Sequence, residues 1–220
     1  MILAAGLGER MRPLTDHTPK PLLEVAGKAL IVYHIERLAA AGFYEIIINI
    51  AHLGFMIPEA LGNGRKWGVN IRYSDEQEEG ALESLGGIVK ALPLIGEETF
   101  LVVNGDVWCD YDFDVSFELN EKLAHLIVVD NPEHNLKGDF ALNESKLAVA
   151  GASKLTFSGI GYYSPKLFKN QHYGRASVVP LLRQAMDLGK VSGEHFKSIW
   201  QDIGTPQRLK EINEMENKKW

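Results

Sequence analysis

Two short segments of this sequence are apolar at nearly every position. EIIINI spans Glu45 to Ile50, and FLVVNGD spans Phe100 to Asp106. A strand with one face in water alternates apolar and polar residues, so these continuous runs suit strands that are covered on both faces. Helical patterns lie between such strands along the chain. Strands alternating with helices predict βαβ units, with a mostly parallel sheet and helices on both of its faces.

The remaining patterns extend this alternation to most of the chain. Helices are expected over residues 29–41, 85–92, 178–189 and 205–219, and strands over residues 1–5, 69–74, 124–130 and 155–164. Gly42 is a suitable end for the first helix, and Thr205 is a suitable cap for the last. Two short runs within residues 138–151 predict a hairpin. We therefore expect a single α/β, Rossmann-like domain over residues 1–220, with a mixed sheet, a smaller elaboration in the C-terminal half and a soft boundary near residue 110.

Charge and cysteine content narrow the class of protein. The 23 basic and 29 acidic residues give a net charge of −6, which argues against nucleic acid as a partner because a phosphate backbone requires a basic face. Cys109 is the only cysteine, so an intramolecular disulfide is excluded and a reducing compartment is favoured. No apolar run approaches the roughly 20 residues of a membrane span, and the N-terminus lacks a basic leader. The prediction is a soluble cytoplasmic protein without a membrane partner, whose oligomeric state the sequence leaves open.

The segment from Leu3 to Leu30 carries the strongest chemical signal. Gly6 and Gly8 follow the first strand, where backbone N–H groups can approach a phosphate without interference from a Cβ atom. The third glycine of a dinucleotide-binding loop and the Gly-Lys-Ser/Thr of a P-loop are both absent. Arg10, Arg12 and Lys20 follow instead, and fixed cations beside a glycine loop suit a triphosphate that releases pyrophosphate.

Two aspartates each follow an apolar stretch and precede turn residues. Asp106 should lie at the carboxyl end of its strand, which is where open α/β sheets bind ligands. Asp202 precedes a Gly-Thr-Pro turn into the last helix. Carboxylate oxygens are the hard ligands that Mg²⁺ prefers, so these two residues are candidates for a shared metal site. Asp110, Asp112 and Asp114 are interpreted as surface acids.

Taken together, these motifs resemble those of a known family. LAAGLGERMRPLT, continued by TPKPL, is similar to the signature loop of the nucleoside-diphosphate-sugar pyrophosphorylases, and NGDVWCDYD and WQDIGTP resemble that family's two metal-bearing segments. The resemblance runs from Met1 to about Leu209. Within the family, NPEHNLKGDFALN and FSGIGYYSPKLF are most similar to segments of the bacterial N-acetylmuramate α-1-phosphate uridylyltransferases. The resemblance implies transfer of a uridylyl group from UTP to N-acetylmuramic acid α-1-phosphate, with Mg²⁺, to give a UDP-sugar and pyrophosphate in peptidoglycan recycling.

The resemblance also assigns roles to matching positions. Nucleotide contacts are expected from Ala4, Ala5, Gly6, Gly8, Arg12, Lys20, Glu83, Gly87 and Asp106. Sugar contacts are expected from Gly138, Asp139, Ser158 and Gly159, and Mg²⁺ ligands from Asp106 and Asp202. The catalytic set is Arg12, Lys20 and Asp106: Arg12 holds the triphosphate, and Lys20 stabilises charge at the α-phosphate. Residues 1–110 then form the nucleotide part, and residues 111–220 form the sugar-phosphate part with the C-terminal helix.

Several alternatives stay open at this level. The same chemistry serves dTTP with glucose 1-phosphate or GTP with mannose 1-phosphate, and a non-catalytic relative could sense a sugar nucleotide. The LESLGG stretch departs from the family pattern because Leu85 adds bulk near the expected base pocket. N-Acetylmuramic acid carries a lactyl carboxylate, for which Lys137, Lys154 and Arg175 are the candidate cations.

Overall fold

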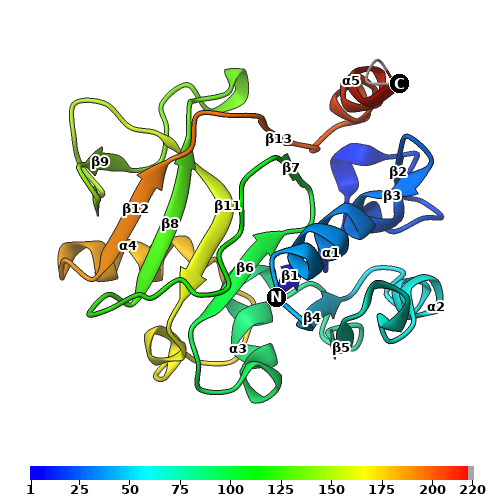
Figure 1. Ribbon diagram of the computed structural model, residues 1–220, viewed down its shortest axis with the longest axis horizontal. Coiled ribbons are helices and arrows are strands. Elements are labelled where there is room, and N and C mark those ends of the chain that lie inside the picture. Colours follow the sequence, from blue (N-terminus) through cyan, green and yellow to red (C-terminus); the bar gives the residue numbers. More distant parts are fainter. Residues whose placement is uncertain (218–220) are drawn as a thin grey trace.

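A central nine-stranded sheet with helices on both faces organises the chain, as a computed structural model of residues 1–217 shows (Figure 1). The strand order is β5-β4-β1-β6-β11-β8-β12-β10-β9. These strands are β1 (Ile2–Leu3), β4 (Glu45–Ile50), β5 (Asn70–Asp75), β6 (Phe100–Asn104), β8 (Ala124–Val129), β9 (Ala141–Asn143), β10 (Lys146–Ala148), β11 (Thr156–Tyr163) and β12 (Val191–His195). The helices are α1 (Leu30–Ala40), α2 (Met56–Leu61), α3 (Glu83–Ile95), α4 (Val179–Asp187) and α5 (Pro206–Asn217).

Parallel and antiparallel pairing divide the sheet. β5, β4, β1 and β6 are parallel neighbours, whereas β11 runs antiparallel to both β6 and β8. The expected α/β fold with a mixed sheet is confirmed. Because β1, β4 and β6 run the same way, their carboxyl ends lie at one edge, where the glycine loop and Asp106 follow β1 and β6. Two short ribbons complete the structure: β2 (Glu24–Val25) pairs with β3 (Lys28–Ala29), and β7 (Val107–Cys109) pairs with β13 (Trp200–Asp202).

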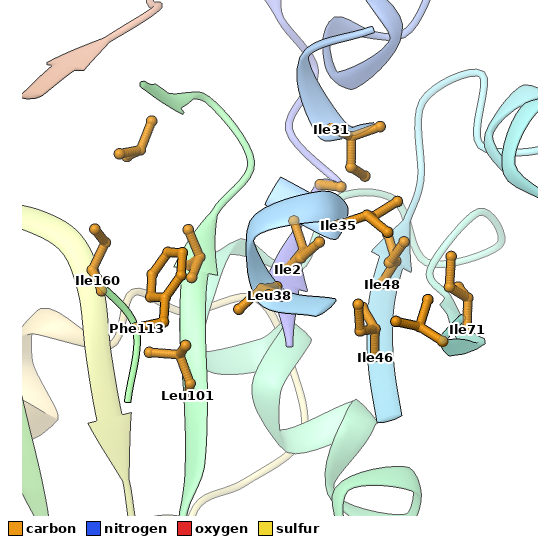
Figure 2. Close-up of a cluster of buried hydrophobic side chains, with 14 of the residues drawn as sticks. Ile2, Ile31, Ile35, Leu38, Ile46, Ile48, Ile71, Leu101, Phe113 and Ile160 are labelled. Atoms are coloured by element: carbon orange, nitrogen blue, oxygen red, sulfur yellow. The ribbon is translucent and has the colours of Figure 1, made fainter. Parts of the chain in front are cut away.

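The apolar strands are buried on both faces, as their composition predicts. Ile46 and Ile48 of β4 pack in one cluster with Ile35 of α1, and Figure 2 shows these side chains facing one another. Ile47, which lies between them in sequence, packs instead in a second cluster with Ile88 of α3. Alternate side chains of one strand therefore belong to two hydrophobic layers, which explains why a run of isoleucines is required there.

Most expected elements are present, and the exceptions are short. α3 begins at Glu83 and extends to Ile95, so it is longer at both ends than the expected helix over residues 85–92. The hairpin is formed by β9 and β10. α2, β12 and the ribbon of β7 and β13 were not predicted, because each is short or lacks a clear apolar period. α5 is described to Asn217, so residues 218–219 of the expected helix lie outside the described residues. Within residues 1–217, every helix is too short or too polar to cross a membrane.

Candidate active site

Two cavities lie at the carboxyl-terminal edge of the sheet and share two residues, Asn104 and Asp106. The first has a volume of about 550 Å³ and is lined by Leu3, Ala4, Ala5, Gly6, Leu7, Gly8, Glu9, Arg10, Met11, Lys20, Pro21, Asn49, Ala81, Glu83, Ser84, Asn104, Gly105, Asp106, Arg175 and Gly204. The second has a volume of about 390 Å³ and is lined by Asn104, Asp106, Val107, His134, Asn135, Asp139, Thr156, Phe157, Ser158, Gly159, Trp200 and Asp202. Two ligands bound side by side would therefore meet at Asp106.

The glycine loop after β1 forms one wall of the first cavity. Gly8 has a φ of +66°, and a Cβ atom there would lie 2.8 Å from Thr15 Cγ2. Thr15 Oγ1 donates a hydrogen bond of 2.8 Å to the Gly8 carbonyl, which fixes the turn. A Cβ atom on Gly6 would meet nothing within 4 Å, so the space in front of Gly6 is open. The loop has the shape that close approach of a phosphate to the backbone requires.

A buried hydrogen-bond network supports this loop from behind. The Ala4 N–H donates to Asn49 Oδ1 at 2.8 Å, and Asn49 Nδ2 donates to Glu76 Oε1 at 2.7 Å. Glu76 Oε2 accepts the Leu82 N–H at 2.9 Å. Glu76 has no exposed surface, and this burial raises the pKa of its carboxyl. Gly87 lies outside the lining but leaves room for the network, because a Cβ there would come within 2.8 Å of Asn49 and Glu76.

The far wall of the first cavity comes from two distant segments. Glu83 has a φ of +60° and accepts a hydrogen bond from Arg175 Nε at 3.0 Å, and both residues line the cavity. Backbone hydrogen bonds tie the same segments together: Leu85 N donates to Ala176 O at 2.8 Å, and Ala176 N donates to Leu82 O at 3.0 Å. The Leu85 side chain is buried in the second hydrophobic cluster, so its bulk lies in the core rather than in the cavity.

The three cations after the glycine loop take different positions. Lys20 Nζ lies 2.6 Å from Asp106 Oδ2, and its side chain is only 13% exposed. Arg10 lines the first cavity. Arg12 lies outside both cavities, is 65% exposed and pairs with Asp16 at 3.4 Å. Arg10 lies within the 3-10 turn Glu9–Met11, and Arg12 follows it. The Met11 side chain between the two arginines is buried, so the two arginine side chains lie in different places. The structure therefore brings Lys20 and Asp106 together and places Arg10, not Arg12, beside them.

Asp106 and Asp202 both line the second cavity because β7 and β13 pair in antiparallel fashion. Asp202 lies opposite Val107 in this ribbon, and the Ile203 N–H donates to the Asp106 carbonyl at 2.7 Å. No group of three or more His, Cys, Asp or Glu residues forms a metal cluster within residues 1–217. Mg²⁺ commonly takes only one or two protein carboxylates and completes its shell with water and substrate phosphates. The two aspartates fit that donor set.

Asp139 is held in the second cavity by backbone and amide donors. Its Oδ2 accepts the Phe157 N–H at 2.8 Å and Asn135 Nδ2 at 3.2 Å. Asn135 Nδ2 also donates to Thr156 Oγ1 at 3.1 Å. Gly138 lies outside the lining and serves the turn before Asp139, since its φ is +61° and a Cβ would lie 2.6 Å from a backbone oxygen. The second oxygen of the Asp139 carboxylate, Oδ1, can accept a hydrogen bond from a hydroxyl of a ligand.

Ser158 and Gly159 line the second cavity at a bulge in β11, where the register with β8 shifts. The Ser158 hydroxyl is buried and donates to the Ile127 carbonyl at 2.7 Å, so it supports the strand. Gly159 has a φ of +80°, and a Cβ there would lie 2.5 Å from Asn104 Nδ2. Trp200 Nε1 donates to the Ser158 carbonyl at 3.0 Å. The bulge thus brings the backbone of β11 directly against Asn104, between the two cavities.

The candidate cations for a sugar carboxylate do not gather in the second cavity. Arg175 lines the first cavity, and Lys137 and Lys154 lie outside both. Among residues 1–217, no lysine or arginine lines the second cavity, whose lining does include His134 and Asn135.

Two asparagines of the site are not among the residues expected from the sequence, although their polar side chains in apolar strands are a recognisable signal. Asn49 and Asn104 are polar residues near the ends of the apolar strands β4 and β6. A polar side chain in a strand that is buried on both faces requires a hydrogen-bond partner or a ligand. That rule would have selected both residues.

Comparison with known proteins identifies the family. The family model described as nucleotidyl transferase matches residues 1–140. An N-acetylmuramate alpha-1-phosphate uridylyltransferase from Neisseria meningitidis is 53% identical over 96% of this chain and 95% of the relative. A protein of the same name from Caulobacter vibrioides is 32% identical over 94% and 92%.

Solved structures support the fold. A protein assigned as a glucose-1-phosphate thymidylyltransferase from Bacillus anthracis superimposes with a TM-score of 0.85, at 22% identity, over 97% of this chain and 93% of that chain. The inositol-1-phosphate CTP transferase from T. maritima gives a TM-score of 0.76 at 18% identity over 97% and 93%. On the sequence matches and the shared architecture, this chain belongs to the nucleotidyl transferase family.

Proposed function

We propose that this protein transfers a uridylyl group from UTP to N-acetylmuramic acid α-1-phosphate, forming UDP-N-acetylmuramic acid and pyrophosphate. The observation that carries the proposal is the pair of cavities that share Asn104 and Asp106. A nucleotide in the first cavity and a sugar phosphate in the second would place their reacting phosphates at one carboxylate. The relative with 53% identity over 95% of its length supports this pair of substrates.

The first cavity suits the triphosphate. The open backbone at Gly6 and the turn at Gly8 offer N–H groups, and Arg10 adds a planar cation with several donors. Asn49 lines the same cavity, with its side chain fixed by Ala4 and Glu76, so it forms a rigid wall for the nucleoside. We therefore assign to Arg10 the role of holding the triphosphate.

Lys20 and the two aspartates act at the point of transfer. A phosphate oxygen of the sugar 1-phosphate attacks the α-phosphorus of UTP, the bond to the β-phosphate bridging oxygen breaks, and pyrophosphate leaves. Lys20 is within 2.6 Å of Asp106 and supplies a cation where negative charge develops. Asp106 and Asp202 would hold Mg²⁺, which when bound neutralises phosphate charge and orients both substrates. No protein nucleophile is required, because positioning and electrostatics account for the catalysis.

The second cavity suits a sugar. Asp139 Oδ2 accepts hydrogen bonds from Asn135 and Phe157, so Oδ1 can accept a hydrogen bond from a sugar hydroxyl. Asn104, which lines both cavities, has a side-chain amide that we assign as a donor for a lactyl carboxylate. We place the reaction in the cytoplasm, where the single thiol of Cys109 would stay reduced, and assign its product to peptidoglycan recycling.

The test is pyrophosphate release with a matrix of UTP, dTTP and GTP against the 1-phosphates of N-acetylmuramic acid, N-acetylglucosamine, glucose and mannose. UTP with N-acetylmuramic acid 1-phosphate should give the highest kcat/KM, because donors that are built for a carboxylate stay unpaired with a neutral sugar. Excess chelator should abolish turnover. Equal kcat/KM for the N-acetylmuramic and N-acetylglucosamine substrates would refute the acceptor assignment. No turnover with any pair would contradict the proposed activity.

A further inference from the structure

Both carboxylate oxygens of Asp202 are held by side chains that come from other parts of the chain. Arg208 Nη1 donates to Oδ2 at 2.7 Å, and His134 Nε2 lies 3.2 Å from Oδ1. Arg208 Nη2 lies 2.7 Å from His134 Nδ1. The three side chains therefore form a closed ring of contacts around one proposed metal ligand.

The chemistry of arginine fixes the direction of the hydrogen bonds that Arg208 makes in this ring. A guanidinium can only donate, so Nδ1 of His134 must be the acceptor. The proton of a neutral imidazole is then on Nε2, which lies 3.2 Å from Asp202 Oδ1. Asp202 thus accepts a hydrogen bond on Oδ2 and has the His134 ring in contact with Oδ1. A carboxylate has about four lone-pair positions, so a position on each oxygen is still available for a metal.

Arg208 is placed by α5, and α5 is itself anchored. Thr205 Oγ1 caps the helix by accepting the Arg208 N–H at 3.4 Å. Asn213, one helical turn further on, accepts the Ala26 N–H at 2.8 Å and donates to Glu24 O at 3.2 Å. These bonds attach α5 to the ribbon of β2 and β3, which follows the loop of Lys20 in sequence. The guanidinium of Arg208 is therefore presented from a fixed element.

Glycine at position 204 permits this arrangement. A Cβ atom there would lie 3.1 Å from Asp202 Oδ2, 3.3 Å from Arg208 Nη1 and 3.1 Å from Arg10 Nη2. The guanidinium that lines the first cavity and the one that holds Asp202 therefore converge on the same small space. A side chain at position 204 would crowd the Asp202 carboxylate and both guanidiniums, which would have to shift by a few tenths of an ångström.

We propose that Arg208 is a positioning residue that orients the Asp202 carboxylate for the metal, with His134 completing the hold on its other oxygen. The proposal rests on the assignment of Asp202 as a metal ligand. Arg208 lies outside both cavities, so it acts through Asp202. The positive charge of Arg208 competes with the metal cation for the carboxylate. Without Arg208, however, the carboxylate could rotate out of the orientation in which it binds the metal. Orientation is the larger effect, as it is for outer-shell partners of metal ligands in general.

The test measures Mn²⁺ binding by electron paramagnetic resonance, with a non-hydrolysable UTP analogue present and no sugar phosphate. The variants are Arg208→Ala and Arg208→Lys, with Lys210→Ala as the matched control. Lys210 is on the same helix, is 70% exposed and pairs only weakly with Glu214 at 3.8 Å. Arg208→Ala should raise the half-saturating Mn²⁺ concentration about tenfold. Arg208→Lys should fall between it and the wild type, and Lys210→Ala should match the wild type.

A pair of variants at His134 tests whether a conservative substitution recovers Mn²⁺ affinity. His134→Ala removes both ring contacts, whereas His134→Gln retains one donor and one acceptor, so glutamine should restore part of the Mn²⁺ affinity that alanine loses. If Arg208→Ala fails to fold, as judged by circular dichroism, Arg208→Lys carries the test. Wild-type or tighter Mn²⁺ binding in the folded Arg208 variants would overturn the proposal. Failure of the proposed function is distinguishable, because the wild-type protein itself would then neither bind Mn²⁺ with the analogue nor release pyrophosphate.

Discussion

The two cavities differ in how they would neutralise a negatively charged ligand. The first is lined by three cations, Arg10, Lys20 and Arg175, together with the glycine loop and three acids, Glu9, Glu83 and Asp106. The second has Asp106, Asp139 and Asp202 in its lining and, within residues 1–217, no lysine or arginine. We therefore expect the protein's own cations to contact a polyphosphate in the first cavity. A sugar phosphate in the second would depend on the cation that we propose the aspartates hold.

Asp106 belongs to both cavities, so a change there should have the largest effect. Asp106→Asn keeps the size of the side chain but removes a metal ligand and the ion-pair partner of Lys20. Losing several kcal/mol of transition-state stabilisation corresponds to a decrease of about a thousandfold or more in kcat/KM. Asp202→Asn should cost less, because Asp202 lines only the second cavity. The exposed Asp112→Asn is the control and should match the wild type. Near wild-type turnover of Asp106→Asn, measured by pyrophosphate release, would remove Asp106 from the mechanism.

Lys20 tests whether the cations of the first cavity serve binding or rate. Lys20→Met should lower kcat about a hundredfold while changing the KM for UTP little, because charge at the α-phosphate grows in the transition state. Steady-state kinetics at saturating sugar phosphate separate the two constants. A change in KM alone would make Lys20 a binding residue, and Asp106 would then be the one charged residue of the first cavity assigned to the reaction step.

Arg10 and Arg12 form a matched pair for triphosphate binding. Arg10→Ala should raise the KM for UTP about tenfold or more, the cost of losing hydrogen bonds to a charged group. Arg12→Ala removes an exposed pair with Asp16 and should change the KM by about twofold at most. Steady-state kinetics give both KM values, and isothermal titration with UTP gives the Kd of each variant for comparison. The opposite ranking would restore the sequence-based assignment of Arg12.

Local patterns alone point to the glycine loop, Lys20 and Asp106 in the first cavity, because each lies within a few residues of a strand end or of one motif. In the second cavity they point only to Asp106 and Asp202, whereas Asp139, Ser158 and Gly159 are expected from the family resemblance. The choice between Arg10 and Arg12 depends on the 3-10 turn Glu9–Met11, whose effect on side-chain direction no short pattern reveals.

The second cavity depends on contacts between distant segments, which periodicity cannot reveal. Asn135 contacts Asp139 within one local turn, but it reaches Thr156 only because the chain returns through the β9–β10 hairpin as the bulged strand β11. The pairing of β12 with β8 brings together segments more than sixty residues apart, and β12 itself contains Gly193 and Glu194 where an apolar alternation would be expected. The lysines at positions 137 and 154 were reasonable candidates by charge alone, but charge says nothing about which way a side chain faces.

The smallest expected effects concern the acceptor, and they test the claim that the second cavity binds its ligand without lysine or arginine. Asn135→Ala should raise the KM for N-acetylmuramic acid 1-phosphate about fivefold, because Asn135 holds Asp139 in place for the sugar hydroxyl and one net hydrogen bond contributes about 1 kcal/mol. Lys154→Ala should leave that KM unchanged, since Lys154 lies outside the lining. Both variants should keep the wild-type KM for UTP, which controls for damage to the first cavity. If Lys154→Ala raises the KM for the sugar phosphate more than Asn135→Ala does, then Lys154 contacts the bound sugar phosphate. The second cavity would then use a lysine to bind its ligand, and the difference in charge between the two cavities would hold only without ligand.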